Sequence, residues 1–375
     1  MDALTTPSNW QRVRLGDICE FGNGGAYETL IVENGNFKLI SLNSIDIDGN
    51  LKNTMKRVNF YDNSLKQDDI VMVLSDVAHG DFLGLCAVIP SNDYVLNQRM
   101  GRLRKKNDCI NILFLRLYIN ANQKYFKMQG QGSSQLNLSK KAIEDFEILL
   151  PPLNEQIAIA NILSDVDRYL YSLDALILKK ESVKKALSFE LLSQRKRLKG
   201  FNQAWQKVRL GDIAEIKRGA SPRPIENPKW FCANSNVGWV RISDISKNSR
   251  FLYKTAQKLS KKGIEKSRFI KQNSLIMSMC ATIGKPIITK IDTCIHDGFV
   301  VFENPKIDLN YLYYFLCYIE KEWLESGQQG SQVNLNVDLI KNKEVFCPKD
   351  LNEQIAIANV LSGLDHEIIS LKNKK

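Results

Sequence analysis

Several features that would point to particular protein classes are missing from the sequence. No uninterrupted apolar run reaches 18 residues, and the first ten residues are polar. A membrane-spanning helix needs about 20 apolar residues, and a secretory signal needs an apolar centre. We therefore expect a cytoplasmic chain with no membrane partner. The 3 histidines and 8 cysteines form no zinc-binding spacing, so we expect buried free thiols and no metal site.

Recognisable catalytic motifs are also missing. The chain has no His-Glu-x-x-His pair and no Asn-Pro-Pro-Tyr methyltransferase motif, and Gly284-Lys285 lacks the upstream glycine of a P-loop. The glycine cluster at 21–25 is not repeated elsewhere, and we interpret it as a turn. We expect no catalytic residue and no cofactor bound by this chain. A self-contained nuclease or methyltransferase with an unrecognised site stays open as the alternative.

Length and composition indicate a folded protein of more than one domain. The chain has 375 residues, is 44% hydrophobic and carries a net charge of +11. Residues 1–150 are neutral overall, whereas 201–350 hold an excess of 8 basic side chains. Basic residues interleaved with aromatic ones suit a phosphate backbone, and a solvated surface remains the alternative. The lysines that we predict to bind DNA are Lys258, Lys261, Lys262 and Lys266.

An internal repeat organises the chain. Residues 153–161 and 351–359 are identical and read Leu-Asn-Glu-Gln-Ile-Ala-Ile-Ala-Asn. A second match joins Trp10–Ile18 to Trp205–Ile213, and a third joins 131–138 to 329–335. The segments between these matches diverge, so the chain consists of two copies of one unit, each a variable body followed by a near-constant segment.

The constant segment predicts a long helix. Pro151 and Pro152 end a strand-like run at 146–150, and Asn154 is a suitable N-cap. Apolar residues then recur at spacings of three and four from Ile159 to Leu191, which predicts a seam that packs against a partner helix. In the second copy the same seam continues only to Leu371, so we expect a helix of about half the length.

Each body predicts a small α+β domain. Strands are expected at 70–74, 86–89, 275–279 and 299–302, and buried helices at 112–119 and 309–319. Two polar segments occur at matched positions in each body and offer small donors and amides that suit phosphates or base edges. Structural turns would use the same residue types. The candidate contacts are Ser75, Asp76, His79, Ser133, Ser134, Gln135 and Asn137 in the first body, and Ser278, Thr282, Lys285, Ser331, Gln332 and Asn334 in the second.

The order of these motifs resembles the DNA specificity subunit of type I restriction-modification systems. The resemblance rests on 10–18, 132–138, the run 150–157 that leads into the long helix, and their second copies. It implies two target recognition domains separated by two long antiparallel coiled-coil helices. The boundaries are then 1–152 for the first recognition domain, 153–200 for the central helix, 201–350 for the second recognition domain and 351–375 for the short C-terminal helix.

The resemblance also implies partners and a function. The chain would read a bipartite, asymmetric target in double-stranded DNA and dock two DNA adenine methyltransferase subunits on its helices. Restriction or translocase subunits could join the complex, and S-adenosylmethionine, ATP and Mg would bind to partner subunits. A protein scaffold that does not bind DNA is a further alternative. Identity at polar helix positions suggests contacts with two like partners, and these positions are Glu155, Gln156 and Asn161 with their copies Glu353, Gln354 and Asn359.

Overall fold

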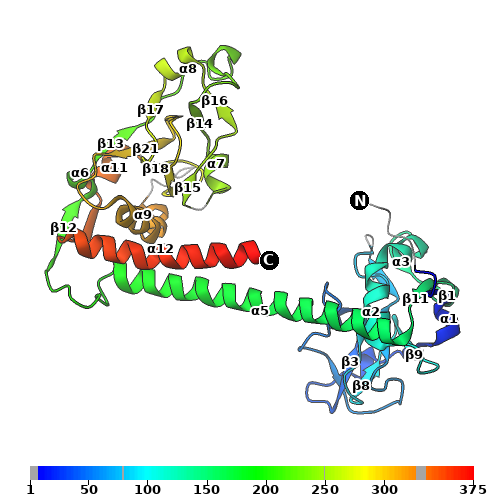
Figure 1. The fold of residues 1–375 in the computed structure, drawn as a ribbon. Coiled ribbons are helices and arrows are strands. Elements are labelled where there is room, and N and C mark those ends of the chain that lie inside the picture. Colours follow the sequence, from blue (N-terminus) through cyan, green and yellow to red (C-terminus); the bar gives the residue numbers. More distant parts are fainter. Residues whose placement is uncertain (1–6, 78–79, 249, 327–334) are drawn as a thin grey trace. The chain divides into compact units, whose positions relative to one another are not determined.

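The computed structural model describes residues 7–77, 80–248, 250–326 and 335–375. The chain divides into two compact units, Met1–Leu170 and Tyr171–Lys375 (Figure 1). No helix of the described residues is both long enough and apolar enough to cross a membrane. Each unit combines a body of sheets and short helices with a long helix, which confirms the predicted fold class.

Unit 1 is built on a four-stranded sheet in the order β2-β9-β5-β7 and a three-stranded sheet in the order β4-β3-β8. Two further pairs, β1-β11 and β6-β10, complete it. Its strands are β1 (Gln11–Arg14), β2 (Cys19–Asn23), β3 (Phe37–Ile40), β4 (Arg57–Val58), β5 (Ile70–Val73), β6 (Ser75–Val77), β7 (Cys86–Val88), β8 (Tyr94–Leu96), β9 (Met100–Lys105), β10 (Gln135–Asn137) and β11 (Glu147–Leu150). Its helices are α1 (Leu15–Ile18), η1 (Glu28–Leu30), η2 (Leu42–Ser44), α2 (Ile112–Ala121), α3 (Gln123–Gln129), α4 (Lys140–Glu144) and the start of α5 (Leu153–Leu192).

The body of unit 2 repeats this plan. Its sheets have the orders β13-β21-β18-β19-β15, β16-β14-β20-β17 and β12-β22. The strands are β12 (Trp205–Arg209), β13 (Glu215–Arg218), β14 (Gly238–Val240), β15 (Phe251–Leu252), β16 (Gln257–Lys258), β17 (Arg268–Ile270), β18 (Leu275–Ser278), β19 (Pro286–Thr289), β20 (Thr293–Ile295), β21 (Phe299–Glu303) and β22 (Glu344–Pro348). The helices are α6 (Leu210–Ile213), η3 (Pro228–Trp230), α7 (Ile242–Ser246), α8 (Lys261–Glu265), α9 (Leu309–Tyr318), α10 (Glu320–Ser326), α11 (Val337–Asn342) and α12 (Leu351–Lys374).

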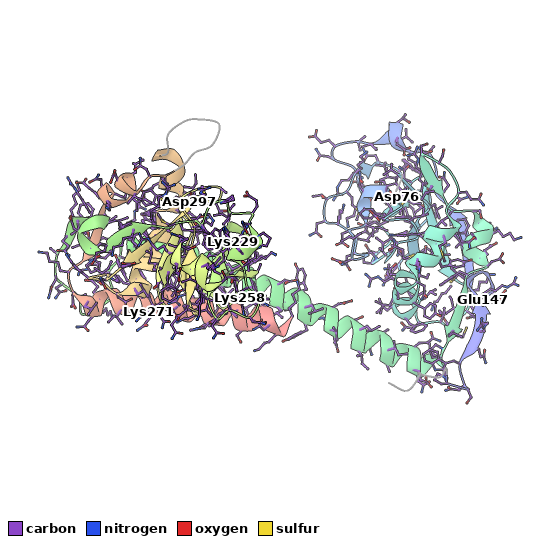
Figure 2. The ribbon with its side chains drawn as sticks, turned by 90° about the horizontal axis from the view of Figure 1, so that it is seen from above. Asp76, Glu147, Lys229, Lys258, Lys271 and Asp297 are labelled. Carbon is purple, nitrogen blue, oxygen red and sulfur yellow. The ribbon has the colours of Figure 1, made fainter. Side chains whose placement is uncertain are left out.

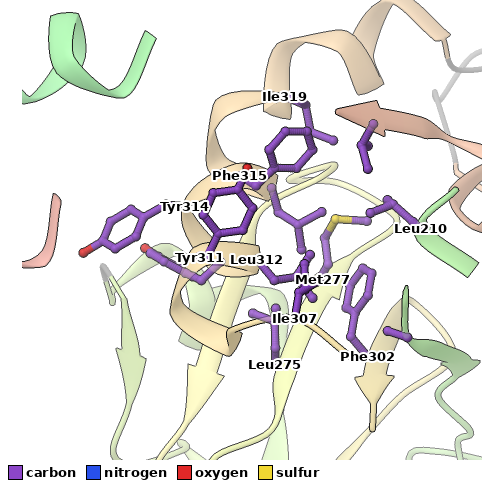
Figure 3. Close-up of a cluster of buried hydrophobic side chains, with 14 of the residues drawn as sticks. Leu210, Leu275, Met277, Phe302, Ile307, Tyr311, Leu312, Tyr314, Phe315 and Ile319 are labelled. Carbon is purple, nitrogen blue, oxygen red and sulfur yellow. The ribbon is translucent and has the colours of Figure 1, made fainter. Parts of the chain in front are cut away.

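The unbroken apolar runs of the central strands are explained by burial on both faces. Successive side chains of a strand point to opposite faces. In β18, Leu275 and Met277 enter the cluster that contains α9, whereas Ile276 enters a second cluster on the other face (Figure 3). Strand β5 is divided between two clusters in the same way. The predicted central strands are confirmed, and so are the helices α2 and α9, whose N-caps Asn111 and Asp308 accept backbone N–H groups.

The long helices α5 and α12 run antiparallel within unit 2. Ion pairs at 2.5–2.8 Å join Lys180 to Glu367, Lys184 to Asp365, Glu181 to Lys372 and Asp174 to Lys375. Helix α5 begins at Leu153 and ends at Leu192, so the prediction of a helix to residue 200 was too long. The chain turns at Gln194, which has a positive φ of 63°.

The predicted seam of α5 is only partly buried. Leu173 and Leu191 are buried, but other seam residues are exposed, namely Ile162, Val166, Tyr169, Leu176 and Val183. The reason is that α5 packs on different neighbours along its length. Ala160 belongs to the core of unit 1, whereas Leu191 and Leu192 belong to the core of unit 2.

All eight cysteines are free thiols. Cys19, Cys86, Cys294 and Cys347 are buried, as expected for small apolar residues, and burial raises the pKa of Cys19 and Cys294 to about 12. The expectation of burial was wrong for two others, since Cys109 and Cys232 are exposed.

Candidate nucleic-acid interface

Three segments of unit 1 meet beyond the end of β5. The backbone N–H of Leu138 donates to the carbonyl of Leu74 at 2.8 Å, and the N–H of Leu74 donates to the carbonyl of Arg99 at 2.9 Å. The pairing of β6 with β10 extends this contact. The two polar segments predicted from the sequence therefore lie side by side, and the turn at 97–99 joins them. We call this arrangement the loop junction of unit 1.

Unit 2 contains the same junction. The N–H of Leu335 donates to the carbonyl of Met279 at 3.0 Å, and the N–H of Met279 donates to the carbonyl of Gly298 at 2.8 Å. These bonds use backbone atoms, so they place few demands on the side chains. One frame can thus carry different side chains in the two units, which is what a pair of binding loops for two different targets requires.

A matched glycine supports each junction. A Cβ atom at Gly24 would lie 2.0 Å from the carbonyl oxygen of Asn97, and a Cβ atom at Gly219 would lie 2.0 Å from that of His296. No other residue type allows so close an approach of two backbones. Gly24, within the glycine cluster at 21–25, is thus explained by a backbone contact that both units share. The interpretation of the cluster as a turn was wrong, since residues 21–23 belong to β2 and Gly25 forms a bridge with Asn97.

The described candidate residues of unit 1 lie at its junction. The side chains of Ser75, Asp76 and Asn137 already form hydrogen bonds within the unit. The Ser75 hydroxyl donates to Oδ1 of Asn137 at 2.6 Å, and the Asp76 carboxylate accepts the backbone N–H groups of Val77 and Phe82 at 2.8 and 2.7 Å. Gln135 is half-buried on β10. Of the candidates, Ser133, Ser134 and Asn137 are exposed, and His79 lies outside the described residues.

In unit 2 one candidate needs correction. Ser278 is fully buried, and its hydroxyl bonds to the carbonyl of Thr282 and accepts the N–H of Lys285 at 3.2 Å. It stabilises the turn and offers nothing to a ligand. Thr282 and Lys285 are half-buried beside it. Ser331, Gln332 and Asn334 lie outside the described residues.

The predicted lysines gather around the short helix α8, away from α12 in unit 2 (Figure 1). Lys258, labelled in Figure 2, lies on β16. Lys261 and Lys262 lie on α8 and Lys266 follows it, and all four lysines are exposed. Arg250, which belongs to the same basic region 201–350, is instead buried and donates to Ser362 on α12 at 2.7 Å. The basic region therefore contains both exposed charges and an arginine that binds the body to α12.

The sequence analysis missed a cavity next to the junction of unit 2. It has a volume of about 390 Å³ and is lined by Ser221, Arg223, Ile225, Trp239, Arg241, Ile242, Ser243, His296 and Asp297. These residues come from β14, the start of α7 and the loops after β13 and β20, so no local sequence motif predicts the cavity. The one available signal was the Arg218 and Arg223 pair in the variable segment that follows the constant motif at 205–213.

Electrostatics within the cavity favour a neutral histidine and a charged aspartate. Burial lowers the pKa of His296, and its Nδ1 accepts the N–H of Gly298 at 2.9 Å. Burial alone would raise the pKa of Asp297, but the hydrogen bond from Ser221 and the charge of Arg223 outweigh it, and the pKa is lowered. Among the residues that the structure describes, no group of three or more metal-binding side chains lies close enough to hold a metal ion.

Four of the six predicted partner contacts on the helices make contacts inside their own unit instead, and three of these four are buried. Gln156 is buried, donates to the carbonyls of Cys109 and Pro151 and accepts the N–H of Asn111. Its copy Gln354 is buried in the same manner, with bonds to Pro348 and Asp308. Glu353 is buried and pairs with Arg197 at 2.7 Å.

Glu155 is half-buried and accepts the side-chain N–H groups of Asn9 and Trp10 at 2.8 and 3.0 Å. The identity of these polar residues between the two copies is therefore explained by contacts inside each unit. Of the six, only Asn161 and Asn359 are fully exposed.

Asn161 and Asn359 belong to a larger set of repeated residues that forms a matched exposed face at the start of each long helix. Leu153, Asn154, Ile157 and Asn161 are exposed on α5, and their copies Leu351, Asn352, Ile355 and Asn359 are exposed on α12. Their spacing places them on one side of the helix, opposite the side that packs on the body. We call these two surfaces the repeated face.

Comparison with known proteins agrees with this arrangement of two like units. The sequence profile of the type I restriction modification DNA specificity domain matches residues 7–180 and again residues 202–375. The chain belongs to this family. With two specificity domains, it is a DNA-recognition subunit of a type I restriction-modification system.

Individual relatives are distant and cover different shares of the chain. The chain is 26% identical over 404 residues to the type I restriction enzyme MjaVIII specificity subunit of Methanocaldococcus jannaschii, covering 100% of this chain and 90% of that protein. It is 25% identical over 177 residues to the EcoprrI specificity subunit of Escherichia coli, covering 45% of this chain and 43% of that protein. In fold it is similar to the S subunit of M. genitalium, with a TM-score of 0.64, 16% identity and coverage of 99% and 94%.

Proposed function

We propose that each unit reads one half of a bipartite, asymmetric DNA target through its loop junction. The observation that carries the proposal is the matched backbone frame, in which Leu74, Arg99 and Leu138 correspond to Met279, Gly298 and Leu335. On this shared frame the turns differ in sequence, with Asn-Gln-Arg at 97–99 in unit 1 and His-Asp-Gly at 296–298 in unit 2. A shared frame with different side chains suits two readers of two different sequences.

We further propose that two copies of a DNA adenine methyltransferase dock on the repeated face. Two like surfaces suit two like partners. The repeated face combines exposed Leu and Ile side chains with Asn, and exposed apolar side chains grouped on one side of a helix are typical of contact surfaces. Restriction or translocase subunits would join the same complex. The site of action is the cytoplasm, where the chain would meet cellular DNA.

In this proposal the chain recognises DNA and catalyses no reaction. S-adenosylmethionine, ATP and Mg would bind to partner subunits. This assignment is supported by membership of a family described by its DNA specificity domain.

The deciding experiment maps methylated adenines in a host genome with and without this chain, in the presence of the methyltransferase. We expect a bipartite motif that disappears when the chain is removed. A second arm incubates the purified chain alone with DNA, Mg and S-adenosylmethionine. Turnover in that arm would contradict the proposal and favour an enzyme with an unrecognised site, whereas absence of DNA binding even with the methyltransferase would favour a protein scaffold.

A further inference from the structure

Four arginines of unit 2 lie at or beside the loop junction, and one of them pairs with the Asp297 carboxylate. Nη2 of Arg223 donates to Oδ2 of Asp297 at 2.9 Å, and Nε of Arg218 donates to the Asp297 carbonyl at 2.8 Å. Nε of Arg268 donates to the carbonyl of Arg218 at 2.5 Å, and Arg241 lines the cavity together with Arg223. Asp297 is labelled on unit 2 in Figure 2.

The positive charge of this cluster is largely unbalanced. Arg218, Arg241 and Arg268 form no ion pair with any carboxylate in the described part of the chain, whereas Arg223 pairs with Asp297. Side chains that only served stability at this place would gain more from acidic partners, as Lys217 does with Glu215 and Glu303 at 2.9 and 2.6 Å. The cluster is therefore suited to a polyanion.

Arg223 differs from the other three arginines in being paired with a carboxylate. The Ser221 hydroxyl donates to Oδ1 of Asp297 at 2.8 Å, which orients the carboxylate, and the carboxylate in turn orients the guanidinium. Only one of the terminal nitrogens of Arg223 is engaged there. Its other N–H groups have no partner among the described residues, and the side chain is 72% exposed. A guanidinium with a fixed orientation loses little further freedom when it binds a ligand.

The chemistry of the pair favours a base edge over a phosphate. A phosphate next to Arg223 would also lie near the negative Asp297 carboxylate, which would repel it. A base edge carries no net charge. Guanine presents two acceptors, O6 and N7, that match an arginine, and cytosine presents an N4 amino group that matches a carboxylate oxygen. Arg223 and Asp297 together thus complement a G·C pair.

We propose that Arg223, oriented by Asp297, reads a guanine of a G·C pair in the half-site of unit 2, while Arg218, Arg241 and Arg268 hold neighbouring phosphates. This assignment rests on the proposed function, because it requires that unit 2 reads a half-site. It separates Arg223, which specifies sequence, from the exposed lysines around α8, which supply affinity for any DNA.

The test compares four variants of the full chain in complex with the methyltransferase: R223K, D297N, R218A and the control R209A. Arg209 is an exposed arginine of unit 2 on β12, outside the cavity. The preferred sequence is determined by selection from random double-stranded DNA, and thermal unfolding checks that each variant is folded.

We expect R223K and D297N to relax the same single G·C position in one half-site and to weaken binding to the original site by roughly 5- to 100-fold. R223K keeps the charge, so the dependence of binding on salt should stay the same. R218A should weaken binding to all sequences alike, and R209A should leave the preferred sequence unchanged.

The assignment is overturned if the folded R223K and D297N complexes keep the wild-type preference, or if they lose affinity equally for all sequences. It is also overturned if the two variants relax different positions or change both half-sites. A wild-type complex without any bipartite preference would instead contradict the proposed function itself, and the two failures are therefore distinguishable.

Discussion

The indole N–H of Trp205 donates a 3.2 Å hydrogen bond to the carboxylate of Glu353, so the first strand of the second body is bound to the first turn of α12. Trp10 makes the equivalent bond to Glu155 in unit 1. The Trp-Gln-x-Val-Arg-Leu-Gly-Asp-Ile motif and the repeated helix start are therefore two halves of one contact. This contact explains why the tryptophan motif and the helix start have nearly the same sequence in both copies, although the segments between them diverge.

Replacing Trp205 by Phe should destabilise the chain by about 1–2 kcal/mol, because the ring is kept while a buried hydrogen bond to a charged acceptor is lost. The matched change Trp10→Phe should cost less, since Trp10 and Glu155 are only half-buried and water can replace the bond. Urea unfolding of both variants measures the difference. Equal losses would show that burial of Glu353 does not set the strength of the contact.

Replacing Lys258, Lys261, Lys262 and Lys266 together by Ala should weaken binding across all DNA sequences. The slope of log affinity against log salt should fall by about 0.9 for each phosphate contact removed. The preferred sequence should stay the same. A changed base preference with an unaltered salt slope would mean that these lysines contact bases.

A charged side chain on one copy of the repeated face should prevent the binding of one methyltransferase and leave the other bound. Ile157→Glu and Ile355→Glu each put a carboxylate into an exposed apolar surface that we expect to be buried in the complex. Light scattering should show two methyltransferases on the wild-type chain, one on each single variant and none on the double variant. A wild-type complex that holds only one would defeat the symmetric arrangement.

Inserting a seven-residue heptad after Ala175 should lengthen α5 by about 10 Å at 1.5 Å per residue. The gap between the half-sites should widen by roughly three base pairs, at 3.4 Å each. Within unit 2, the insertion separates Asp174 from Lys375 but leaves the other ion pairs to α12 in register.

Methylation mapping of the insertion variant should show unchanged half-sites. The added twist, near a third of a turn, would abolish methylation if the complex cannot accommodate it. An unchanged gap in an active complex would mean that α5 does not set the spacing, and altered half-sites would mean that the units do not read independently.

The chain should lose stability as the pH falls below about 6.5, partly because of His296. Its pKa is lowered by burial in the folded state, so the unfolded chain binds the proton more readily, and protonation favours unfolding. His296→Asn keeps an acceptor near the N–H of Gly298 and removes the titration. The melting temperature of this variant should therefore fall less than that of the wild type between pH 7 and pH 5.5, and equal falls would assign the effect to other groups.

Local sequence patterns were sufficient for the elements and for the family. The apolar runs at 70–74 and 275–279 predicted central strands, and the spacing of apolar residues predicted the long helix from residue 153, because periodicity depends on neighbours along the chain. The identity of 153–161 with 351–359 revealed the two units without any structural information.

Tertiary structure alone decided which polar residues face outward. Ser278 and Gln156 look like surface residues in the sequence, but the fold buries both and uses their polar atoms for turns and helix starts. The arginine cluster joins Arg223 to Asp297, which are 74 residues apart in the chain. Hydrogen bonds between such distant residues depend on how strands pair and loops meet, and periodicity along the chain carries no information about either.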